Sequence, residues 1–224
     1  METIISSELD NLEICEQALS TSRKRGQFLK SLMAASGGLA AVAAVGPAAL
    51  ASASTARGAA VIPKSDIDIL NFALTLEWLE RTFYEQAVAR VPFQQSSVRR
   101  LAMTLRGDET NHTVALTGNV KNYGGVPVGR APHYNFPAGV FKTQSAFLGL
   151  SESLEDTGVH AYLGQARNIK TPSILLTAAT IVTVEARHAG AIRYQNGKNL
   201  TSGPFDSGFT KAQVLGVAGP LIGS

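Results

Sequence analysis

Cysteine is nearly absent from this chain of 224 residues, because Cys15 is the only one. A single thiol excludes a framework of disulfides and a metal site built from thiolates. The sequence also lacks a cluster of Lys and Arg with interleaved aromatic residues, and its formal net charge is only +3. It therefore gives no positive support to nucleic-acid binding. The length suits one domain with an additional segment.

The additional segment is N-terminal, and its residue types follow the order of an export signal. A basic cluster at 23–25 precedes a nearly uncharged stretch, 32–50, rich in Ala, Gly and Val, and the small residues 51–53 follow as a signal peptidase requires. We expect residues 1–53 to be an export signal, 54–64 a linker and 65–224 the folded domain, exported to the periplasm or cell envelope of a bacterium. The alternatives are an uncleaved membrane anchor, which the small residues would make weak, and a tail that stays in the cytoplasm.

Residues 22–30 resemble a bacterial twin-arginine signal, whose usual form is S-R-R-x-F-L-K. The match is imperfect, because the basic pair Lys24-Arg25 leaves one extra residue before Phe28. The export machinery is therefore an expected partner, and the twin-arginine pathway is one candidate route of export.

Apolar residues recur every three or four positions in four long segments, which predicts helices over about 66–91, 97–123, 143–168 and 171–196. Ser65 is a plausible N-cap for the first helix. Thr171 followed by Pro172 is a strong start signal for the fourth. A short fifth helix is expected over 211–219, opened by a capping box of Thr210 and Gln213.

The connections between these helices predict the topology. The first and second helices, and likewise the third and fourth, are joined by only a few residues, so each pair must be antiparallel. The link over 124–140 is long and contains several Gly and Pro. Short, long, short is the pattern of a four-helix bundle with one crossover. The sequence therefore predicts an all-α, ferritin-like four-helix bundle with one long crossover and a short C-terminal fifth helix.

Two Glu-x-x-His pairs stand on the second and fourth predicted helices. Positions i and i+3 of a helix lie on the same side, so both side chains of a pair can reach one point in the core. The first and third helices each offer a glutamate on the apolar face. This is the ligand set of di-iron and di-manganese carboxylate bundles. The predicted metal ligands are Glu77, Glu109, His112, Glu155, Glu185 and His188.

The residue types suit a pair of divalent cations. A buried glutamate is costly unless it is paired or bound to a metal. Four glutamates would balance two divalent ions, and neutral imidazoles add no charge. Carboxylate with imidazole suits iron or manganese, with zinc left open. A random order of the seven Glu and four His after residue 53 would give about 0.16 such pairs, so two are a specific signal.

Three further groups of side chains bear on the site. Tyr84 follows Glu77 by seven residues, so it shares that face of the helix and is a candidate for a catalytic role in redox or hydrogen bonding, with a core tyrosine as the alternative. Glu152 is the rival of Glu155 on the third helix. Glu80 and Glu85 lie off the apolar face of the first helix and are expected to be solvated, with Glu80 as the reserve ligand. Asp108 is next to a predicted ligand in sequence and is not expected to support a histidine.

The stretches 70–80, 154–162 and 214–220 resemble ferritin-like proteins sometimes called desiccation-related, which often carry export signals. The resemblance runs from about residue 64 to the C-terminus and includes both Glu-x-x-His pairs. It implies the ferritin-like fold and a di-iron site. It does not imply a settled activity.

Three functions remain open at this point. The first is an oxidoreductase with two iron ions, or manganese in their place, that oxidises Fe(II) or reduces O₂ or peroxide. The second is metal binding without turnover, and the third is protection of the cell envelope under drying stress. The expected partners are metal ions, O₂ or peroxide and the export machinery, and a homodimer is left open.

Overall fold

A computed structural model describes residues 62–223 of the protein. The expected export signal and nearly all of the expected linker lie outside these residues. The described part is helical, and its one pair of bridging β residues joins Tyr134 to Ile222. Its elements are α2 (Lys64–Arg90), α3 (Ser96–Asn122), α4 (Gln144–Ala166), α5 (Pro172–Gln195), α6 (Lys211–Ala218) and the 3₁₀ turn η1 (Gly219–Leu221).

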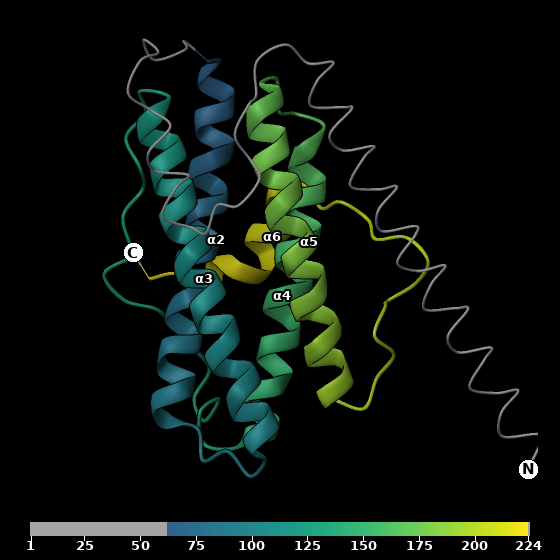
Figure 1. The fold of residues 1–224 in the computed structure, drawn as a ribbon. Helices are drawn as coiled ribbons and strands as arrows, with labels where there is room; N and C mark the ends of the chain where they lie inside the picture. Colours follow the sequence, from purple (N-terminus) through teal and green to yellow (C-terminus); the bar gives the residue numbers. More distant parts are fainter. Residues whose placement is uncertain (1–61, 224) are drawn as a thin grey trace, which may run out of the picture. The chain divides into compact units, whose positions relative to one another are not determined.

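The four long helices form two neighbouring pairs, α2 with α3 and α4 with α5 (Figure 1). Each pair is joined by a short turn, and a long irregular segment leads from α3 to α4. The short helix α6 runs across the long helices and packs against α4. The predicted four-helix bundle with one long crossover and a fifth C-terminal helix is therefore confirmed. Among the described helices, none is both long and apolar enough to cross a membrane.

The start of α2 differs from the prediction. Its N-cap is Pro63 rather than Ser65, and the carbonyl of Pro63 accepts the N–H of Asp66 at 2.9 Å. The buried carboxylate of Asp66 in turn accepts the backbone N–H groups of Lys170 at 3.1 Å and Thr171 at 2.7 Å. These bonds tie the first turn of α2 to the turn before α5. A long-range contact thus stabilises the first turn of α2.

The starts of α4, α5 and α6 follow local signals. The side chain of Thr143 accepts the N–H of Ala146 at the start of α4, which is an ordinary N-cap bond. Thr171 caps α5 and Pro172 is at its first position, although the Thr171 side chain makes no cap bond. The predicted capping box of Thr210 and Gln213 is present at α6.

The core has two apolar clusters, one toward each end of the bundle. The larger one contains Phe83, Tyr84 and Phe147 and extends to α6 and the crossover. The smaller one contains Leu74, Leu116 and Tyr162. Buried charged side chains lie beside Tyr84 in one cluster and Tyr162 in the other. The bundle therefore holds a polar layer between two apolar ones.

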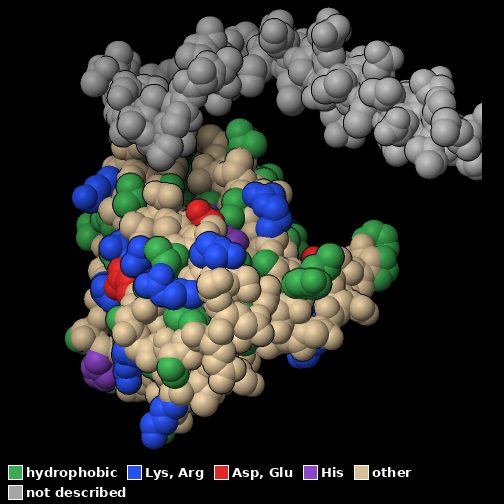
Figure 2. Space-filling view, turned by 60° about the horizontal axis from the view of Figure 1, so that its bottom comes forward, with side chains coloured by type: hydrophobic (Ala, Val, Ile, Leu, Met, Phe, Trp, Pro, Cys, Tyr) green, Lys and Arg blue, Asp and Glu red, His purple; other side chains and the backbone are tan. Residues whose placement is uncertain are grey.

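The surface is poor in acidic groups because most glutamates of this domain point inward. Five of the seven glutamates in the described residues are buried. Figure 2 shows a face on which Lys and Arg side chains are interspersed with hydrophobic and other uncharged ones, and acidic side chains are few. Most glutamate carboxyl groups of the domain thus lie in its interior.

Candidate metal centre

The structure brings together all six residues that the sequence singles out as ligands. All six side chains are buried, at 0–8% exposure. Each long helix contributes to the cluster because its 3.6-residue period turns those positions inward. The contributors are Glu77 from α2, Glu109 and His112 from α3, Glu155 from α4, and Glu185 and His188 from α5.

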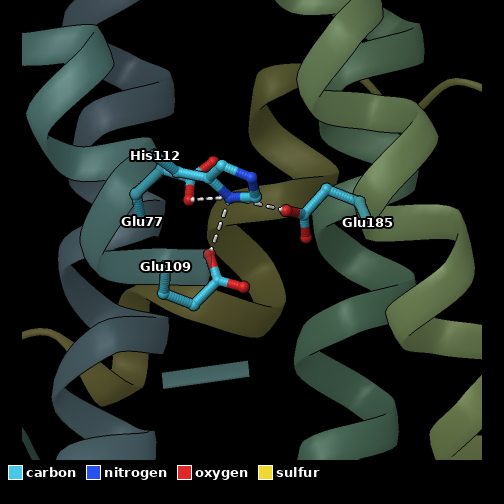
Figure 3. Close-up of side chains that lie close together, drawn as sticks. All are labelled: Glu77, Glu109, His112 and Glu185. Carbon is cyan, nitrogen blue, oxygen red and sulfur yellow. Dashed lines mark hydrogen bonds and ion pairs between the residues drawn. The ribbon is translucent and has the colours of Figure 1, made fainter. Parts of the chain in front are cut away.

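The first half of the cluster surrounds the imidazole of His112 (Figure 3). Its Nδ1 lies 3.1 Å from Oε2 of Glu77, 3.0 Å from Oε2 of Glu109 and 3.1 Å from Oε1 of Glu185. One ligand atom from each of these four residues lies within 4.8 Å of the others. Three carboxylates and one imidazole therefore converge on a single small volume.

The second half surrounds His188. Its Nδ1 lies 3.1 Å from Oε1 of Glu109 and 3.3 Å from Oε2 of Glu155. Glu109, Glu155, Glu185 and His188 form a second group whose ligand atoms lie within 4.8 Å of one another. Glu109 and Glu185 belong to both groups, and Glu109 presents Oε2 to one half and Oε1 to the other.

Burial and mutual repulsion control protonation in the cluster when no metal is present. Burial and the charge of Glu77 raise the pKa of Glu109 to about 8. Burial and the charge of Glu109 raise the pKa of Glu185 well above its usual range. Burial alone would lower the pKa of His188, but the carboxylates of Glu109 and Glu155 beside its Nδ1 raise it to about 12. Protonated imidazoles thus supply positive charge among the carboxylates.

Several buried oxygen and nitrogen atoms of the cluster lack hydrogen-bond partners and are suitable metal ligands. Within the described residues, the side-chain nitrogen and oxygen atoms that are themselves fully buried and lack a hydrogen bond are Trp78 Nε1 and five atoms of the cluster: Glu109 Oε1, Glu155 Oε2, both carboxylate oxygens of Glu185, and His188 Nδ1. The contacts of His188 Nδ1 are close enough for ion pairing but lack hydrogen-bond geometry. Unsatisfied buried polar atoms are rare and cost about 1–3 kcal/mol each. Their concentration on carboxylates and one imidazole suits a cation held by oxygen and nitrogen ligands.

Two tyrosines hold the outer carboxylates. The hydroxyl of Tyr84 donates to Oε1 of Glu155 and also lies 2.5 Å from Oγ of Ser151. The hydroxyl of Tyr162 donates to Oε1 of Glu77 at 2.5 Å. Burial, with the adjacent carboxylate charge, raises the pKa of both tyrosines well above the usual range, so both keep their protons. Tyr162 was not among the predicted site residues, although Tyr162 follows Glu155 by the same seven positions that separate Tyr84 from Glu77.

The position of Asp108 corrects an expectation from the sequence. Its Oδ2 lies 3.1 Å from Nε2 of His188, the ring nitrogen that faces away from the cluster. Neighbours in sequence do point to different sides of a helix, but the other side of α3 faces α5 here. An outer carboxylate of this kind orients a histidine and selects its tautomer. Asp108 therefore supports His188 from outside the cluster.

Glu155 and Glu152 take different environments on α4. Glu155 points into the cluster, whereas Glu152 lies at the edge of the bundle and accepts bonds from Asn196 at 2.6 Å and Lys198 at 2.8 Å. Those partners lower the pKa of Glu152 despite its partial burial. The geometry thus favours Glu155, as the register of its helix face had indicated.

The expectation that Glu80 is solvated was wrong. Its side chain is 3% exposed. Both α3 and α4 pack on α2, so the buried face of α2 is wider than one stripe and includes a position three residues after Glu77. Glu85 is partly exposed and pairs with Arg81 at 2.9 Å and Arg130 at 2.7 Å.

The comparison with known families agrees with the geometry. Residues 65–198 match the sequence model described as the ferritin-like domain. The match covers the four long helices and all six clustered residues. No curated protein matches the chain. The packing of four helices around a buried carboxylate and histidine cluster, together with this match over more than half of the sequence, places the chain in the ferritin-like domain family.

Proposed function

We propose that this chain holds two iron ions between its four long helices and is an oxidoreductase that oxidises Fe(II) or reduces O₂ or peroxide. The observation that supports two ions is the pair of overlapping ligand groups that share Glu109 and Glu185. A single ion would leave one imidazole and one outer glutamate unused. Manganese is the alternative metal, because the same donor set suits both.

The ligand roles follow from the two halves of the cluster. Glu77 and His112 would bind one ion, and Glu155 and His188 the other. Glu109 and Glu185, which belong to both ligand groups, would help to hold both ions. Four carboxylates neutralise two divalent cations, so the filled site would carry no net charge in a region that water barely reaches. That balance would replace the protonated imidazoles of the metal-free protein.

The surrounding residues would orient the ligands. An iron pair supplies electron transfer to O₂ or peroxide when it is bound. Tyr84 and Tyr162 donate to one oxygen of Glu155 and Glu77 respectively, which leaves the second oxygen of each carboxylate for an ion. Asp108 accepts from Nε2 of His188, which leaves Nδ1 as the free electron pair toward the cluster. Tyr84 would in addition have a redox or hydrogen-bonding role beside the centre.

Metal analysis of the full chain tests this proposal. The protein would be purified without added metal, and again after loading with Fe(II) in oxygen-free buffer. We expect about two ions per chain and loss of both in the double variant Glu109→Ala/Glu185→Ala. The control Glu152→Ala removes a carboxylate that pairs with Asn196 and Lys198 outside the cluster, and should bind as the wild type does.

Oxidation assays then separate catalysis from simple metal binding. The loaded protein should oxidise added Fe(II), or consume peroxide, faster than the double variant. Stoichiometric metal without turnover would instead support a non-catalytic metal-binding or stress-protection protein. Absence of metal in both preparations would contradict the centre itself.

We propose further that the domain is exported, because basic, apolar and small residues follow one another in residues 23–53. Fractionation of a bacterial host with mass determination of the chain tests this. The expected product begins after Ala53 and lies outside the cytoplasm. Replacing both Lys24 and Arg25 by Gln should block export if the twin-arginine route is used. An intact chain in the cytoplasm would contradict export.

A further inference from the structure

A fifth carboxylate is buried at the cluster, on α2 between Glu77 and Tyr84. The side chain of Glu80 is 3% exposed. Within the described residues it has neither a hydrogen bond nor an ion pair, whereas Glu77, Glu109, Glu155 and Glu185 each lie close to a histidine or tyrosine of the site. Because an isolated buried carboxylate is costly, a role that requires it is to be expected.

The side chain of Glu80 is aimed at the same space as a shared ligand. Gly158 of α4 faces this space, and a Cβ atom at Gly158 would lie 3.2 Å from Oε1 of Glu80 and 3.1 Å from Oε2 of Glu185. Both oxygens therefore converge on the volume that the glycine leaves open. Glu185 is one of the two glutamates that belong to both ligand groups.

The two halves of the bundle are nearly symmetric around this point. Glu77 precedes Tyr84 by seven residues, and Glu155 precedes Tyr162 by seven, with each tyrosine bonded to the glutamate of the other helix. Three residues after Glu77 comes Glu80, and three after Glu155 comes Gly158. At this pair of symmetric positions, α2 therefore has the carboxylate of Glu80, whereas α4 has Gly158, which leaves space for it.

We propose that Glu80 is a seventh ligand of the metal centre and binds beside Glu185. This inference rests on the proposed centre, and it adds one carboxylate to the four that already balance two divalent ions. A fifth negative charge matches a pair of ions with five positive charges, that is, one Fe(II) and one Fe(III). Glu80 should therefore stabilise the more oxidised pair and lower its reduction potential.

The test compares the full-length wild type with Glu80→Gln, which keeps the shape of the side chain and removes its charge. The matched control is Glu85→Gln on the same helix, whose carboxylate pairs with Arg81 and Arg130. Fe(II) affinity would be measured without oxygen, and the reduction potential by titration of the loaded protein. We expect Glu80→Gln to lose at least about 10-fold in affinity, the loss that removal of even an outer partner causes. The potential should rise, and Glu85→Gln should match the wild type.

A second variant reaches the same space from α4. Gly158→Ala places a methyl group against both carboxylate oxygens, within distances that force them to move. The backbone of Gly158 is helical, so alanine should fold there without loss of helix stability. We expect this variant to fold as the wild type does and to bind Fe(II) more weakly. Because Glu185 is itself a proposed ligand, the contribution of Glu80 is the part of this loss that disappears when Gly158→Ala is made in the Glu80→Gln variant.

The outcomes separate the two proposals. If the wild type binds two ions while Glu80→Gln keeps its affinity and its potential, the seventh ligand is refuted and the six-ligand centre stands. If the wild type binds no metal, the centre itself is refuted and the seventh ligand with it. X-ray absorption would compare the iron coordination of the loaded wild type with that of loaded Glu80→Gln. We expect the variant to have one oxygen ligand fewer per pair of iron ions.

Discussion

The hydroxyl of Tyr162 on α4 donates a hydrogen bond of 2.5 Å to Oε1 of Glu77 on α2. In the opposite direction, the hydroxyl of Tyr84 on α2 donates a hydrogen bond to Oε1 of Glu155 on α4. This reciprocal pair joins two helices that are not sequence neighbours. It also places a neutral donor on each outer carboxylate of the cluster. The two bonds therefore hold the ligand geometry from opposite ends.

Replacing Tyr162 by Phe tests the strength of this contact. A hydrogen bond to a charged group contributes about 1.5–3 kcal/mol, and the variant leaves a buried oxygen of Glu77 without that donor. We expect the free energy of unfolding of the metal-free protein to fall by that amount in urea titrations. Tyr123→Phe is the control, because its hydroxyl bonds Ser173 at an exposed position. Equal losses in both variants would contradict the assignment.

The stability of the metal-free protein should fall as pH rises from 5 to 8. The folded state raises the pKa of Glu109 from 4.5 to about 8, through burial and the charge of Glu77. Between these values the folded protein binds more protons than the unfolded chain, so raising the pH favours unfolding. Glu80 and Glu185, with raised pKa values, act in the same direction. Each such proton changes the free energy by about 1.4 kcal/mol per pH unit.

Urea unfolding at pH 5, 6.5 and 8 with a chelator present would measure this effect. Groups with a lowered pKa, such as Asp66 and Glu152, contribute fully above pH 4.5 and cannot offset the trend. A bound metal competes with protons for the same ligands, so metal should stabilise the protein more at pH 8 than at pH 5. Stability that is constant or rises over this range without metal would contradict the protonation described above.

Asp66→Ala should weaken the bundle without affecting the cluster. The variant removes the acceptor for the backbone N–H groups of Lys170 and Thr171, which connect α2 to the turn before α5. We expect a loss of about 1–3 kcal/mol in the free energy of unfolding. Asp68→Ala, whose carboxylate pairs with Lys64 at the surface, should change it by less than about 1 kcal/mol. Thermal or urea unfolding of both variants would measure these free energies, and equal losses in the two variants would contradict the prediction.

Asp108→Ala should reduce metal affinity while the fold is kept. The carboxylate of Asp108 lies 3.1 Å from Nε2 of His188 and is partly exposed, so its removal leaves no buried charge. Loss of such an outer partner costs about 10–100-fold in metal affinity. Asp156→Ala is a suitable control because Asp156 pairs with Arg193. Anaerobic titration with Fe(II) would measure both, and an unchanged affinity in Asp108→Ala would show that His188 is oriented by other contacts.

Much of the fold was predictable because its signals are local. The 3.6-residue period of apolar residues, the proline after Thr171 and the capping box at Thr210 each act within one or two turns of helix. The spacing of Glu109 and His112 is likewise a property of one helix. Predicted helix ends therefore differ from the observed ones by at most two residues, and at α2 the residue assigned as N-cap was also wrong.

The pattern of residues along the chain is sufficient to show which residues share a helical face, and with them the four helices and the six clustered side chains. Which other faces are covered depends on how the helices pack. Glu80 is buried because α3 and α4 both pack on α2, and Asp108 meets His188 because α5 lies beside α3. The first turn of α2 is joined to the turn before α5 because Asp66 finds donors about 104 positions later. Period and spacing describe one helix at a time, whereas burial depends on the neighbours that each helix acquires on folding.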